Sequence, residues 1–278
     1  MTGAKLKILT KNILILLTLT IFYGCSGKEK LHFEKLHNVI NRYYIEDIEI
    51  KKSISLNETE NINLLLSKLD KFSLYINDST HIPKTIYHEK YSSKIIKNTI
   101  LYIKVPYFDN NVQKNIQKSI DSLSQNITKI ILDLRDNAGG NLQQAIKTVD
   151  LFIDDGLIIT VRKKDKYNTR RYFASKNSTI TNLPLIILVN KKSASSSEIV
   201  AGSLKYHNRA ILIGEKTYGK GTIQAMIYLN KTKSEAIRLS VARYFFNDNI
   251  VNDDGIEIDI PIIDGTIRDK ILEKALFL

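Results

Sequence analysis

Three short runs of residues in the sequence have the types and spacing for acyl transfer, and each follows an apolar stretch. They are DLRDNAGG (133–140), SASSSE (193–198) and GEKTYGKGTIQ (214–224). Polar and glycine residues that follow the buried strands of an α/β sheet commonly form its functional site. Together the runs offer a serine hydroxyl, a lysine amine and a glycine turn, which are a nucleophile, a base and oxyanion donors.

The first run has two interpretations that its residues leave open. The pair Gly139-Gly140 supplies the positive φ angles of an ordinary turn, which is the interpretation this run favours by itself. A glycine turn at a helix start also forms a nest of backbone N–H groups, which can bind an anion or a developing oxyanion.

The second run fits a helix cap, which is by far the commoner role of such a motif, and it also fits a nucleophile. Ser195 and Glu198 match the S-x-x-E capping box that begins many helices. The same position places the Ser195 hydroxyl at the positive end of the helix dipole, where negative charge is stabilised. The N–H of Ser196 would point to the same place, so both roles are compatible.

The third run resembles a phosphate-binding P-loop but departs from it in residue type and context. Gly221 stands where a Ser or Thr is needed, and a strand is expected afterwards in place of a helix. Lys220 is therefore either an exposed lysine or a desolvated one whose lowered pKa makes it a base. Gln224 lies four residues later on the same strand face, where it can orient the amine.

Histidine is not needed for this chemistry. The five histidines lie outside the three runs, and they are His32, His37, His81, His88 and His207. A Ser-His-Asp triad therefore has no support in the sequence.

Elements that alternate between strand and helix must position these runs. The expected strands are 100–108, 129–134, 183–190, 210–214, 222–229 and 236–246, with a hairpin from 156–164 and 169–174. The expected helices are 31–48, a segment within 60–76 that ends near Asp70, 109–126, 141–153, 196–207 and 266–278, and residues 77–98 are polar and irregular. This order predicts an α/β fold with a mixed, partly parallel sheet, helices packed on it, and a small helical N-terminal region.

Composition narrows the class of protein. The chain has 278 residues, of which 43% are hydrophobic and 25% charged, as in globular domains and unlike disordered chains. Its net charge is +12, but the lysines are dispersed without a basic block, so no nucleic acid is expected as a partner. A single cysteine, Cys25, excludes an intrachain disulfide.

Residues 1–24 predict a signal peptide, because lysines precede an apolar run at 13–22 that is too short to span a bilayer. Cys25 follows Gly24, which resembles the lipobox of bacterial lipoproteins and implies lipidation of Cys25. An ordinary secretory signal and an uncleaved anchor are the alternatives. Each places the chain outside the cytoplasm, and lipidation would anchor it to a membrane of the cell envelope, facing the periplasm or the exterior.

The order and spacing of the three runs resemble the carboxyl-terminal processing (tail-specific) serine peptidases, family S41, over about Ile100–Pro261. The resemblance implies a ClpP/crotonase-like core. It implies that Ser195 is the nucleophile, Lys220 the general base and Gln224 the residue that orients Lys220.

The resemblance also assigns an oxyanion hole to backbone groups of Gly139, Gly140 and Ser196, and it implies no metal or cofactor. Some members carry an Asp eleven residues after the nucleophile, where this chain has Tyr206. That difference leaves the Ser–Lys dyad intact.

The family usually inserts a PDZ domain of about 80–100 residues before the core, whereas this chain has only about 25 residues at 76–99. PDZ domains capture free C-termini by strand addition, so a regulatory or adaptor protein could take that place here. The expected regions are a lipoprotein-type signal peptide at 1–24, a helical region at 25–98, a peptidase core at 99–265 and a C-terminal helix at 266–278.

The sequence therefore predicts a serine endopeptidase that acts on unfolded or C-terminal segments of exported proteins. The alternative is a lipoprotein that binds peptide or another ligand on the same scaffold without catalysis. A nucleotide-binding role for residues 214–220 is a third hypothesis.

Overall fold

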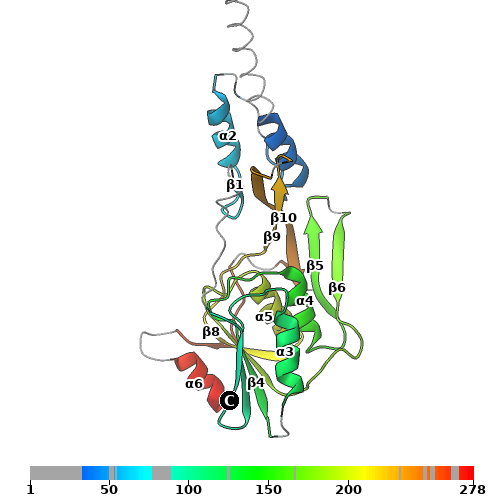
Figure 1. Cartoon of the computed structure of the whole chain (residues 1–278), viewed down its shortest axis with the longest axis vertical. Helices are drawn as coiled ribbons and strands as arrows, with labels where there is room; N and C mark the ends of the chain where they lie inside the picture. The colour runs from blue at the N-terminus through cyan, green and yellow to red at the C-terminus, as the bar shows by residue number, and fades with distance from the viewer. Residues whose placement is uncertain are drawn as a thin grey trace, which may run out of the picture. The chain divides into compact units, whose positions relative to one another are not determined.

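The computed structural model describes residues 33–49, 53, 55–76, 89–123, 126–165, 167–231, 233–246, 249–250, 254–263 and 269–278 (Figure 1). The chain divides into two compact units, one of Met1–Ile82 with Gln224–Val241 and one of Pro83–Ile223 with Ala242–Leu278. The predicted signal peptide and Cys25 lie outside the described residues. In the described ranges, no helix is both long and apolar enough to cross a membrane.

The larger unit is built on a six-stranded sheet with the order β12-β8-β7-β4-β3-β2. Its strands are β2 (Ser92–Ile96), β3 (Ile100–Lys104), β4 (Lys129–Asp133), β7 (Leu185–Val189), β8 (Ala210–Gly214) and β12 (Ile260–Pro261). All neighbours pair in parallel except β2, which is antiparallel to β3 at the edge. All five residues of β7 are buried, as expected for a parallel sheet that is covered on both faces.

Helices cover both faces of this sheet, because alternate side chains of each strand point to opposite sides. They are α3 (Val112–Asp121), α4 (Leu142–Asp150), α5 (Ser196–Tyr206) and α6 (Lys270–Phe277). Ile130 and Leu132 of β4 join the core formed with α3, α4 and α5, whereas Ile131 between them packs with Ile271 and Ala275 of α6. The two helical layers are therefore separated by the strands.

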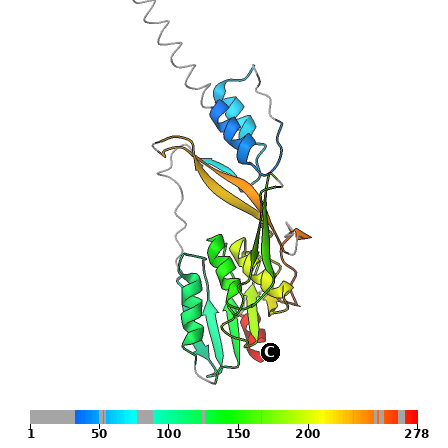
Figure 2. The same ribbon diagram turned by 90° about the vertical axis from the view of Figure 1, so that its right-hand side faces the viewer.

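The larger unit also contains an antiparallel hairpin that packs beside α5. Strands β5 (Leu157–Lys163) and β6 (Thr169–Phe173) form the hairpin that the sequence predicts. The second half of β10 (Ala236–Phe246) pairs with β5, and β11 (Asn249–Ile250) pairs with β10. In Figure 2 the hairpin of β5 and β6, coloured green, is seen nearly edge-on.

The smaller unit combines N-terminal helices with a distant part of the chain. Its elements are the helical residues 33–43, α2 (Glu58–Leu66), β1 (Leu74–Ile76), most of β9 (Thr222–Tyr228) and the first half of β10, which pairs with β1. Leu36, Ile40 and Leu65 form its core with Ile237 and Leu239 of β10. Residues 224–241 thus fold with the N-terminal segment rather than with their sequence neighbours.

The structure confirms the mixed α/β fold class with helices on both faces of a partly parallel sheet. The prediction that 77–98 is irregular is wrong for residues 92–96, which form β2. Polar residues are tolerated there because β2 is an exposed edge strand, so burial does not enforce an apolar pattern. The connection between β1 and β2 is residues 77–91, which is too short for a PDZ domain.

Candidate active site

The three chemical runs of the sequence become three loops at one edge of the parallel sheet. They follow β4, β7 and β8 and comprise residues 134–141, 190–195 and 215–221. Because parallel strands present their carboxyl ends at the same edge, these loops come together even though up to about 80 residues separate them.

Ser195 has the backbone geometry of a residue held in a strained turn. It is the N-cap of α5, with φ +55° and ψ −113°, and it is half-buried. A non-glycine residue with positive φ is uncommon, and such strain tends to collect at functional sites. A nucleophile on a sharp turn between strand and helix is a known arrangement in hydrolases.

The glycine pair packs directly against Ser195. Gly139 has φ +108° and Gly140 has φ +140°, both in the region that favours glycine. A Cβ atom on Gly139 would lie 2.8 Å from the Ser195 Cβ, and one on Gly140 would collide with the backbone of Phe108. The turn therefore needs glycine both for its conformation and for its approach to the serine.

The buried Asn137 joins the first two loops, a role that the sequence analysis missed although Asn137 lies inside the first run. Its backbone oxygen accepts hydrogen bonds from Ala194 N at 3.0 Å and from Ser197 Oγ at 2.8 Å. Its side-chain Oδ1 accepts from Gly139 N at 2.8 Å, and its Nδ2 donates to Val105 O at 2.7 Å. This one residue fixes the glycine turn beside the start of α5.

Gly140 presents its polar groups toward α5. Phe108 forms a parallel bridge with Gly140 by bonding its two neighbours, with Phe108 N donating to Gly139 O and Asn141 N to Phe108 O. In a parallel ladder the bridged residue itself then points its N–H and C=O to the other side. Ser196 Oγ donates to Gly140 O on that side at 3.0 Å.

The carboxylate of Glu198 connects the second loop to the third. Its Oε2 accepts from the backbone N of Ser195 at 2.7 Å and from that of Lys220 at 2.9 Å. Its Oε1 accepts from Thr217 Oγ1 and Gly219 N, both at 2.7 Å. The Ser195 N–H bond is the half of the predicted capping box made by Glu198. The same buried carboxylate thus brings the backbones of Ser195 and Lys220 to one atom.

Two further residues complete the frame around Lys220. Thr217 Oγ1 accepts from Ile256 N at 2.7 Å while donating to Glu198. Tyr244 is buried, and its hydroxyl donates to Lys220 O at 2.8 Å. Thr217 lies within the third run and so had a sequence signal, whereas Tyr244 comes from β10 and had none.

Gln224, the residue expected to orient Lys220, belongs to the smaller unit. It is half-buried on β9, and its Nε2 donates to Ser240 Oγ at 3.0 Å. Its action on the Lys220 amine stays a prediction.

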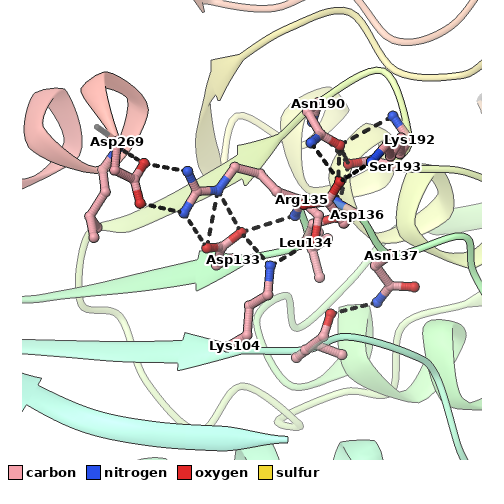
Figure 3. Close-up of polar contacts among 12 residues, drawn as sticks. Lys104, Asp133, Leu134, Arg135, Asp136, Asn137, Asn190, Lys192, Ser193 and Asp269 are labelled. Atoms are coloured by element: carbon pink, nitrogen blue, oxygen red, sulfur yellow. Dashed lines mark hydrogen bonds and ion pairs between the residues drawn. The ribbon is translucent and has the colours of Figure 1, made fainter. Parts of the chain in front are cut away.

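At the start of the loop that carries the glycine turn lies a second cluster of charged residues, which Figure 3 shows. Asp133, at the end of β4, is buried and accepts hydrogen bonds from Arg135, from Tyr102 at 2.7 Å and from Lys104 at 3.4 Å. Burial disfavours the charged form of Asp133, but the hydrogen bonds of Arg135 and the charge of Lys104 outweigh it and lower the pKa of the carboxyl. Burial likewise opposes the charge of Arg135, while its bonds to Asp133 and Asp269 raise its pKa.

Comparison with known proteins gives a consistent picture. Residues 99–262, more than half of the chain, match the model of peptidase family S41. The chain is 38% identical over 148 residues to the chloroplastic carboxyl-terminal-processing peptidase 2 of Arabidopsis thaliana. That match covers 51% of this chain and 28% of the relative. The chain thus spans roughly a third of the length of the curated relatives that it matches first.

Two solved structures resemble the chain, one more in sequence and the other over more of its length. A photosystem II D1 C-terminal processing protease matches with a TM-score of 0.54 and 26% identity, covering 63% of this chain and 48% of that one. A lipoprotein from Streptococcus agalactiae matches with a TM-score of 0.67 and 16% identity, covering 90% and 95%. The second likeness concerns the fold alone, but it extends over nearly the whole of both chains.

Proposed function

Because the chain belongs to peptidase family S41, we propose that it is a serine endopeptidase in which Ser195 is the nucleophile and Lys220 the general base. The observation that carries this proposal is the shared carboxylate oxygen of Glu198, which accepts from the backbone N of both residues. A dyad from two loops requires that the loops be held together, and this atom holds them.

The proposed reaction begins with attack of Ser195 Oγ on the carbonyl carbon of the peptide bond, while Lys220 Nζ takes the hydroxyl proton. The tetrahedral oxyanion is stabilised by backbone N–H groups. The amine leaves with the proton from Lys220, which produces an acyl-enzyme. Water then attacks the ester, Lys220 removes its proton and returns it to Ser195 Oγ, and the acid product departs.

We assign the oxyanion donors to Gly140 and Ser196. The N–H of Gly139 already donates to Asn137 Oδ1 at 2.8 Å, so Gly139 serves chiefly to shape the turn. The contact of Ser196 Oγ with Gly140 O keeps the two donor residues adjacent. In this scheme Gln224 orients the Lys220 amine.

The test is cleavage of a denatured protein by the full chain, with the cut ends mapped by mass spectrometry and Ser195 labelled by a fluorophosphonate. Ser195→Ala should lower cleavage roughly 1,000-fold or more and abolish labelling without unfolding the chain. Cleavage that survives this substitution refutes the assignment. A wild-type chain that binds peptide but is never labelled supports the non-catalytic alternative instead.

Lys220→Arg tests the base separately. Arginine keeps the positive charge but does not lose a proton at working pH, so this variant should be as inactive as Ser195→Ala. In the wild type, activity should rise with pH because the neutral amine is the working form. A Lys220→Arg variant with wild-type turnover would exclude Lys220 as the base.

For the location of the chain, we propose an exported lipoprotein anchored through Cys25 and acting on exported proteins. The lipobox-like sequence that ends at Cys25 supports this. Cys25→Ser should release the protein from membranes and prevent incorporation of labelled palmitate. Membrane retention of this variant without any lipid label would favour an uncleaved anchor.

A further inference from the structure

Arg135 connects the C-terminal helix to the loop that carries the glycine turn. Its Nη1 and Nη2 donate to the two carboxylate oxygens of Asp269, the Nη2 bond being 3.0 Å. Its Nε and Nη2 also donate to Asp133, at the end of β4, at 3.0 and 2.6 Å. Figure 3 shows the guanidinium between the two carboxylates.

The backbone of Arg135 is held as firmly as its side chain. Its N–H donates to Asp133 Oδ1 at 2.9 Å, and its carbonyl accepts from Lys104 Nζ at 2.8 Å. Only a few residues further along, the same loop reaches Gly139 and Gly140 beside Ser195. A displacement of Arg135 would therefore be passed on to the oxyanion turn through a short segment of chain.

The helix α6 does not depend on this ion pair for its attachment. Ile271 and Ala275 are fully buried in the core on its side of the sheet. At the other end of the helix, Lys129 Nζ donates to Ala275 O at 3.0 Å and to Leu276 O at 3.3 Å. The side chain of Asp269 is 39% exposed, and a partly exposed ion pair contributes little to stability, so the effect of the Arg135–Asp269 pair is better sought in the loop.

Resting on the function proposed above, we propose that Arg135 is a positioning residue. Its ion pair with Asp269 attaches residues 134–140 to the helix α6. This attachment sets where the Gly140 N–H lies relative to Ser195. The helix thereby governs the turnover rate through the oxyanion turn.

Asp269→Asn in the full chain tests this directly, with Lys129→Met as the matched control. Asp269 is also the N-cap of α6, accepting from Leu272 N at 3.0 Å, and Asn caps a helix as well as Asp does. The substitution therefore removes the ionic clasp while keeping the cap. Lys129→Met loosens the opposite end of the same helix without touching the loop.

We expect Asp269→Asn to lower kcat about 10-fold with KM within twofold, and to raise deuterium exchange of the amides of residues 134–141. Asp269→Glu, which keeps the carboxylate, should recover most of the rate. Lys129→Met should lower the melting temperature but leave kcat and loop exchange unchanged.

Wild-type kcat and loop exchange in Asp269→Asn would overturn the proposal. So would an equal loss of kcat in Lys129→Met at the same folded fraction. Deuterium exchange does not depend on catalysis, so it shows whether Asp269 holds the loop even in an inactive protein. A wild type that neither cleaves protein nor is labelled would refute the proposed function, whatever the exchange result.

Discussion

Two carboxylates, Glu198 and Asp133, are completely buried in the same unit but are stabilised in opposite ways. Glu198 accepts four hydrogen bonds, three from backbone N–H groups and one from the hydroxyl of Thr217. In the described part of the chain it forms no ion pair. Asp133 instead faces two cations, Arg135 and Lys104.

The difference shows what each carboxylate positions. Glu198 connects two loops directly, because it accepts hydrogen bonds from the backbone N–H groups of Ser195, Gly219 and Lys220. Asp133 is connected to the C-terminal helix indirectly, because its partner Arg135 also binds Asp269 at the start of that helix. The first arrangement fixes the backbones of Ser195 and Lys220 relative to each other, and the second balances charge while supporting a neighbouring helix.

The largest expected loss of stability comes from removing the charge of Asp133. Asp133→Asn removes the buried counter-charge of Lys104 and leaves Arg135 with only the partly exposed Asp269, which should lower the free energy of unfolding by about 3–5 kcal/mol. Urea denaturation measures the effect. Asp259→Asn is the control, because Asp259 pairs with Lys205 at a partly exposed site and should cost only about 1 kcal/mol. Equal losses in both variants would contradict the contrast between buried and exposed charge.

The same change at Glu198 should affect catalysis as well as stability. Each carboxylate oxygen accepts two donors, so in Glu198→Gln an NH₂ group must face two of them whichever way it turns. We expect a loss of about 3 kcal/mol in unfolding free energy and a decrease of about 100-fold in kcat from misplaced loops. Glu257→Gln is the matched control, since Glu257 forms an exposed pair with Lys216 and should leave both quantities unchanged. A fully active Glu198→Gln would show that this joint is dispensable.

The smallest effect is a pH dependence that distinguishes the wild type from Asp133→Asn. The folded state lowers the pKa of Asp133, so its contribution is complete above the ordinary Asp pKa of about 4 and is lost as the pH falls toward the folded value. The difference in unfolding free energy between the two proteins should therefore narrow in acid. A difference that stays constant from pH 7 to pH 3 would mean that Asp133 keeps its ordinary pKa.

Much of the fold could be predicted because burial leaves a local pattern. The five apolar residues of β7 indicate a strand buried on both faces, and the apolar residues of α3 recur at the period of a helix. The hairpin of β5 and β6 could be predicted because its two strands are adjacent in the sequence. The edge strand β2 could not be predicted, since its side chains are mostly exposed. The grouping of residues 224–241 with the N-terminal helices depends on packing between segments that are far apart in sequence.

The sequence by itself determined the chemical groups of this protein: a serine at a helix start, a lysine between glycines, a glycine pair after a strand, and the family to which they belong. Only the tertiary structure decided which atoms hold them together, because the partners of Glu198, Asn137 and Arg135 come from separate strands, helices and loops. The residue types and their spacing along the chain indicate which functional groups are present. The positions of these groups depend on hydrogen bonds that form only when the sheet brings distant loops to one edge.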